Sequence, residues 1–152
     1  MGANHEILRG GVPDERIVKF IKRHHVLSLA TRSDEGLWCA ALFYAYSADL
    51  QAFIFTSDPT TRHAAEMKEC ARVAASIVLE TRVVGRVQGL QIEGEATLAE
   101  GEEFAAAKSA YLKKFPYAAV AELHLWLLRP VQMKLTDNTL GFGRKLIWMA
   151  DE

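Results

Sequence analysis

The residues best suited to chemistry lie in one stretch, Phe53–Met67, with the sequence FIFTSDPTTRHAAEM. An apolar run ends there in a group of hydroxyl and basic side chains: Thr56, Ser57, Thr60, Thr61, Arg62 and His63. A helix is expected to begin at this point, and its first N–H groups have no partner within the helix. Such N–H groups, nearby hydroxyls and a guanidinium together suit a phosphate dianion. One interpretation of the stretch is therefore an anion-binding site.

A second interpretation of the same stretch is purely structural. Ser57 or Asp58 can cap the helix, and Pro59 suits its first turn. Arg62 and Glu66 have the spacing of an ion pair on the helix surface. The local residues leave both interpretations open, although the stretch holds more hydroxyls than one cap requires.

Residues 136–148, TDNTLGFGRKLIW, form a second stretch that is dense in turn-forming and basic side chains. Its two glycines permit a positive φ, which is typical of a hairpin loop. The alternative is a loop whose backbone approaches a ligand, supported by Arg144, Lys145 and Trp148. Elsewhere, Lys113 and Lys114 are expected to be charges at the C-terminal end of a helix.

Several other kinds of site are not predicted. His24 and His25 are adjacent and so point in different directions, and the remaining histidines show no metal-binding spacing. The two cysteines lie in apolar surroundings without a metal or redox motif. Glycine loops of the Walker or dinucleotide type are absent, and no GxSxG sequence marks a nucleophilic serine. We therefore expect no metal site.

The elements that position these residues follow from hydrophobic periodicity and turn signals. We predict helices over 13–24, 59–70 and 101–115, and strands over Val26–Thr31, Leu37–Tyr46, Gln51–Thr56, 72–80, 90–99, 125–138 and 144–149. Most connections between strands are short, which favours an antiparallel barrel with peripheral helices over repeated βαβ units. The expected fold class is mainly β, as one domain over residues 1–152 with a flexible segment at 1–12.

The predicted strand Leu37–Tyr46 is apolar on both of its faces. One face is expected to fill the core of the barrel, and the other to meet a second subunit or a ligand.

Composition excludes some classes of function. The net charge is −1, with 18 basic and 19 acidic residues, so no nucleic-acid interface is predicted. The longest apolar runs are far shorter than the roughly 20 residues of a membrane span. The N-terminal residues show no apolar signal core, so a cytoplasmic protein with reduced thiols is expected.

Five segments taken together resemble, in order and spacing, the YhbP-like family of small bacterial proteins: GLWCAALFY, FIFTSDPTTRHAAEM, LQIEGEATLAEGEE, AYLKKFPYA and KLTDNTLGFGRKLIW. The resemblance covers most of residues 24–149. More broadly, residues 26–80 resemble the pyridoxamine 5′-phosphate oxidase-like superfamily. That resemblance implies an antiparallel, FMN-binding split β-barrel that works as a homodimer.

The same resemblance implies roles for individual residues. Phe55 and Thr56 match the strand end that contacts the flavin, and Thr61, Arg62 and His63 match the motif that holds the FMN phosphate, with Ser57 as support. The backbone of residues 40–43 would border the flavin ring. Lys145 and Trp148 would reach the flavin of the partner subunit. The superfamily has a lysine at His63 and commonly a proline at Trp38, so the chain departs from it at both positions.

The function that this resemblance implies is that of an FMN-binding flavoprotein, an oxidoreductase of unknown substrate. Oxidation of pyridoxamine phosphate itself is not expected, because the arginines that bind the substrate phosphate have no counterpart here. The alternative is a non-enzymatic ligand-binding or sensor module on the same dimeric barrel, for flavin or for haem with His63 or His124 as ligand. A dimeric interaction protein with a vestigial pocket is a further option.

Overall fold

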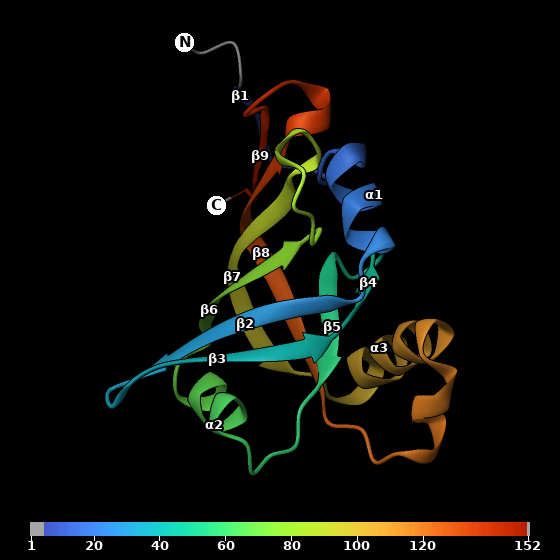
Figure 1. Ribbon diagram of the computed structural model, residues 1–152. Coiled ribbons are helices and arrows are strands. Elements are labelled where there is room, and N and C mark those ends of the chain that lie inside the picture. Colours follow the sequence, from blue (N-terminus) through green and yellow to red (C-terminus); the bar gives the residue numbers. More distant parts are fainter. Residues whose placement is uncertain (1–4, 152) are drawn as a thin grey trace.

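The computed structural model describes residues 5–151, and strands are its main regular structure (Figure 1). The strands are β1 His5–Arg9, β2 Val26–Ser33, β3 Gly36–Phe43, β4 Ala45–Ser47, β5 Ala52–Thr56, β6 Arg72–Val78, β7 Gln88–Leu98, β8 Leu125–Asp137 and β9 Lys145–Met149. The α-helices are α1 Glu15–Arg23, α2 Arg62–Glu69 and α3 Gly101–Lys114, and the 3-10 helices are η2 Val84–Arg86, η3 Pro116–Val120 and η4 Asn138–Leu140.

The strands form one mixed sheet in the order β1-β9-β8-β7-β6-β2-β3. Strand β5 also pairs with β8, and β4 with β5, whereas β1 pairs with β9 in parallel. All other pairs are antiparallel, as the sequence predicts. The sheet is not closed, because β3 lies near β5 without a hydrogen-bonded ladder between them. The fold is therefore a split barrel that is mainly β, and the prediction of fold class is confirmed.

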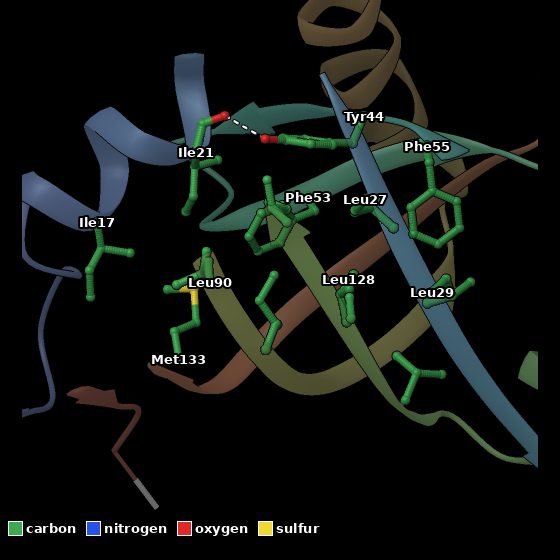
Figure 2. Packing of buried hydrophobic residues seen from close by; sticks show 14 of the residues in the cluster. Ile17, Ile21, Leu27, Leu29, Tyr44, Phe53, Phe55, Leu90, Leu128 and Met133 are labelled. Carbon is green, nitrogen blue, oxygen red and sulfur yellow. Dashed lines mark hydrogen bonds between the residues drawn. The ribbon is translucent and has the colours of Figure 1, made fainter. Parts of the chain in front are cut away.

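The barrel is open where the chain passes from β3 in one part of the sheet to β4 in the other. The predicted single strand over 37–46 is in fact two strands, with Tyr44 between them. Strand β3 pairs with β2 on one side of the opening, and β4 pairs with β5 on the other. Tyr44 is buried, and its hydroxyl donates a 2.6 Å hydrogen bond to the carbonyl of Ile21 (Figure 2).

The core fills the barrel with large apolar side chains from the strands and from α1. Ile17, Phe20 and Ile21 form the buried face of α1, and Asp14 caps its N-terminus. Figure 2 shows this face packing toward Phe53, with strand residues around them. A second cluster lies under α3, where Ala107 and others pack against β5 and β8.

Strand β8 joins the two parts of the sheet because it pairs with β5 over its first half and with β9 over its second. On its other edge it pairs with β7, and the register there shifts between Glu93 and Gly94. Pro130 faces Gly94 at this irregularity, where a residue without an N–H group disrupts the ladder least.

Two further differences from the sequence-based expectations concern the N-terminal segment and β3. Residues 5–9 belong to the segment expected to be flexible, yet they form β1; residues 1–4 lie outside the described part of the chain. Strand β3 is mostly exposed, with Leu37 and Phe43 largely open to solvent. Within residues 5–151, the structure has no helix that is both long and apolar enough to cross a membrane.

Candidate functional site

The candidate site is built around the start of α2, which begins later than predicted. Thr61 caps the helix by accepting a hydrogen bond from the N–H of Ala64 at 3.3 Å. Asp58 instead accepts hydrogen bonds from the backbone and hydroxyl of Thr60. This local turn ends before the helix starts, so Pro59 precedes the helix and neither Ser57 nor Asp58 is its cap.

Arg62 is the first residue of α2, and three neighbours hold its guanidinium. Its Nε donates to Glu66 at 2.9 Å, and its Nη2 donates to the backbone carbonyl of Leu37 at 3.4 Å. The ring of Trp38 lies 4.5 Å below the guanidinium carbon, which is a cation–π arrangement. The side chain is still 43% exposed.

Glu66 is the anchor of this arrangement, and it is not on the surface as predicted. The residue is only 5% exposed, and its carboxylate accepts hydrogen bonds from Arg62, from the hydroxyl of Thr31 at 2.8 Å and from that of Ser33 at 3.2 Å. These bonds, that of Arg62 first, hold the pKa of Glu66 below its usual value. The sequence missed this role because the two hydroxyls come from β2, a distant segment.

His63 points away from Arg62 and into the protein. It is buried, and its Nε2 lies 2.8 Å from the hydroxyl of Ser57, which is also buried. Burial lowers the pKa of His63, so the neutral imidazole is favoured. His63 therefore does not supply the exposed cation that the superfamily has at this position.

The strand end before α2 offers only one of its two predicted side chains. Phe55 is fully buried in the core, so its ring is not available to a ligand. Thr56 lies at the end of β5, and its hydroxyl oxygen accepts a 3.0 Å hydrogen bond from the N–H of His124. The hydroxyl proton of Thr56 is not used in that bond and can still be donated.

Lys145 and Trp148 lie on β9, which is at the opposite end of the molecule from α2 (Figure 1). Trp148 is 2% exposed within the main core, so it cannot reach a partner's ligand without leaving that core. The amine of Lys145 lies 3.4 Å from the hydroxyl of Thr136. Of the predicted site residues, the structure brings together those from 55 to 63 and leaves these two apart.

A hollow of about 510 Å³ lies beside Arg62. It is lined by one basic residue and several acidic ones: Ser33, Asp34, Glu35, Arg62, Ala65, Glu66 and Glu69. The carboxylates on this side of the guanidinium disfavour a phosphate there. In the described part of the chain, no cluster of three or more histidine, cysteine, aspartate or glutamate residues suits a metal ion.

Comparison with solved structures supports the fold. The heme binding protein of Mycobacterium smegmatis superposes with a TM-score of 0.66 at 22% identity, over 84% of this chain and 57% of that one. A FAD-binding protein of Mesorhizobium loti gives 0.66 at 16% identity, over 79% and 89% of the two chains. HutZ, the heme storage protein of Vibrio cholerae, gives 0.64 at 15%, over 78% and 90%.

Comparison of sequences identifies the family more specifically than comparison of structures does. The family model described as pyridoxamine 5′-phosphate oxidase matches residues 13–137, so the protein is of the pyridoxamine 5′-phosphate oxidase-like class. A UPF0306 protein of Klebsiella pneumoniae is 38% identical over 135 residues, and UPF0306 protein YhbP of Salmonella paratyphi B is 39% identical; each alignment covers 89% of this chain and 92% of the relative. Within that class, the chain belongs to the YhbP-like UPF0306 family.

Proposed function

We propose that the protein binds FMN at the start of α2 and serves as an oxidoreductase of the pyridoxamine 5′-phosphate oxidase-like type. The observation that carries the proposal is Arg62, which a buried carboxylate fixes at the start of α2 while 43% of its side chain is exposed. The class to which the chain belongs and the FAD-binding neighbour support a flavin as the ligand.

The donors at this site fit a phosphate monoester, although with one cation fewer than the superfamily provides. Arg62, the first N–H groups of α2 and the hydroxyl of Thr56 would hold the phosphate. Thr61 would contribute mainly by ordering the helix start, because its hydroxyl already donates to the carbonyl of Asp58 at 2.8 Å. Ser57 and His63 are hydrogen-bonded to each other and would support the end of β5 from the protein interior.

A bound flavin would supply the redox chemistry, and the residues of this chain would bind and orient it. Strand β3 pairs with β2 along one edge, and no strand within residues 5–151 pairs with its other edge, which lies beside the opening of the barrel. The backbone groups of residues 40–43 that point to this second edge are available to a ligand. These groups would border the flavin ring, and the half-exposed Trp38 would cover Arg62.

We also propose that the protein is a homodimer. The outer face formed by β2, β3 and β6 carries four large exposed apolar side chains, those of Val26, Leu37, Phe43 and Val78. Val26 and Phe43 face each other in the ladder, so they share this face. Small residues between them leave a hollow of about 450 Å³, lined among others by Ser28, Ala30 and Ala74. A second copy would remove this apolar surface from water.

A second candidate function is binding of haem by a non-enzymatic or sensor protein. Two structural neighbours described as heme proteins favour this candidate. His124 is the better axial ligand, since its side chain is 36% exposed whereas His63 is buried against Ser57.

The test of the proposal is the visible spectrum of the purified protein, before and after addition of FMN. Flavin absorbance that remains with the protein through gel filtration supports FMN, and a Soret band after addition of haem supports the alternative. Failure of the wild-type protein to bind either one overturns both candidates.

The assignment of Arg62 is tested separately. Arg62→Ala is expected to weaken FMN binding by about 1–3 kcal/mol, the scale of a hydrogen bond to a charged group. Arg16→Ala is the matched control, because Arg16 is an equally exposed arginine that pairs with Glu6 and Asp14. Equal affinities of wild type and Arg62→Ala would show that the phosphate lies elsewhere.

A further inference from the structure

Three lysines converge on a pocket that shares no residue with the proposed flavin site. The pocket has a volume of about 320 Å³ and lies between α1, β4 and α3. Its lining contains no acidic residue and consists of Lys22, Ala45, Tyr46, Ala110, Lys113 and Lys114. The two alanines leave space that the lysine side chains surround.

Lys114 is not the solvated helix-end charge that its sequence position predicts. Its ammonium group donates a 2.6 Å hydrogen bond to the carbonyl of His24, at the end of α1. The same group lies 4.5 Å from the ring centroid of Tyr44 and 5.5 Å from that of Phe115. This partial burial lowers the pKa of Lys114 to about 8.

Within residues 5–151, none of these three lysines forms an ion pair with a carboxylate. Lys22 lies in the last turn of α1, and Lys113 in the last turn of α3, where cations complement the helix dipole. That effect explains each lysine alone, but it does not explain why they surround one pocket with the half-buried Lys114. The pKa of His24 is also lowered, first by burial and then by the charges of Arg23, His25 and Lys114.

We propose that this pocket binds a small anion that carries at least two negative charges, of the phosphate or polycarboxylate type. Lysine ammonium groups act as mobile point charges that can adjust to either type. Lys22 and Lys113 would approach the anion from opposite sides of the pocket, and Lys114 would contact it from the pocket floor. The added negative charge would offset the cost of holding the half-buried Lys114 charged.

The test is calorimetric titration of the full chain with inorganic phosphate, pyrophosphate and citrate. We expect millimolar or tighter binding of at least one of them, and a loss of about tenfold or more in the double variant K22A/K113A. The matched control is K19A/K108A, which removes two exposed lysines from the same two helices. Preference for pyrophosphate or for citrate would identify the type of anion.

A second measurement is independent of affinity. The bound anion is expected to slow acylation of Lys114 by an amine-directed ester, read by peptide mass spectrometry, while Lys68 on α2 is unaffected. The proposal is overturned if the wild type binds none of the three anions, if K19A/K108A loses as much affinity as K22A/K113A, or if Lys114 is not protected. None of these results depends on flavin binding.

Discussion

At the scale of single residues, the candidate site shows how one buried carboxylate can set the role of an arginine. Glu66 keeps Arg62 in a defined orientation, but its negative charge also reduces the attraction of the site for an anion. Because His63 is turned inward, no second cation compensates for that charge. A phosphate bound here would therefore depend on Arg62 and the helix start.

The inward orientation of His63 leads to a prediction about stability. Its pKa in the folded protein is lowered from the ordinary value of 6.5, so the unfolded chain binds the proton more readily. The free energy of unfolding should therefore decrease as the pH falls from about 7 through 6.5 toward the lowered pKa. His63→Gln removes this titration and should make the decrease smaller, as measured by guanidinium unfolding between pH 5 and 7.5.

The variant His24→Gln is the control for that measurement. Its pKa is lowered as well, chiefly by burial, so part of the decrease should remain in His63→Gln. His24→Gln should remove the other part, and the double variant should show the smallest dependence on pH. Identical pH dependence of wild type and His63→Gln would contradict the assignment of His63 as a buried neutral base.

At the scale of elements, the sequence predicts the helices and strands whose hydrophobic periodicity reflects a single buried face. The alternation in β7 is an example, because Leu90, Ile92 and Ala96 are buried while Gln91 and Glu93 are exposed. The break at Tyr44 was not predictable in this way, since the strand is apolar on both sides of it. The late start of α2 was missed because several hydroxyls competed as caps, and only the turn at Asp58 decides between them.

The contact between β7 and β8 gives a prediction at this scale. A Cβ atom on Gly94 would lie 2.4 Å from the backbone carbonyl oxygen of Arg129, and a backbone cannot move aside as a side chain can. Gly94→Ala is therefore expected to lower the free energy of unfolding by about 2–4 kcal/mol. Gly89→Ala in the same strand meets its nearest atom only at 3.7 Å and should cost less than about 1 kcal/mol. Denaturant unfolding of both variants measures the difference, and equal stabilities would contradict it.

At the scale of the whole molecule, the sequence predicts the class of the fold but not how its strands pair. Residues 125–137 are predictable as one long strand, yet nothing local shows that β5 and β9 share one of its edges. The same limit applies to the site. The order of Thr61, Arg62 and His63 offers an anion site as one interpretation, whereas the contact of Arg62 with Trp38 requires α2 and β3 to meet. The bonds that hold Glu66 bring in β2 as a third segment.

The outer face of the sheet gives the last prediction, which concerns assembly. Leu37 is 79% exposed and Val78 66% exposed toward opposite ends of this face, and the proposed dimer would bury both. Sedimentation equilibrium of the wild type should give a mass near twice 16.9 kDa. Val78→Glu would place a charge in that interface and should shift the mass toward that of the monomer.

Val120→Glu is the matched control, because Val120 is 97% exposed on η3 and should leave the dimer intact. A monomeric wild type would rule out the dimer, and a dimeric Val78→Glu would place its interface on another face.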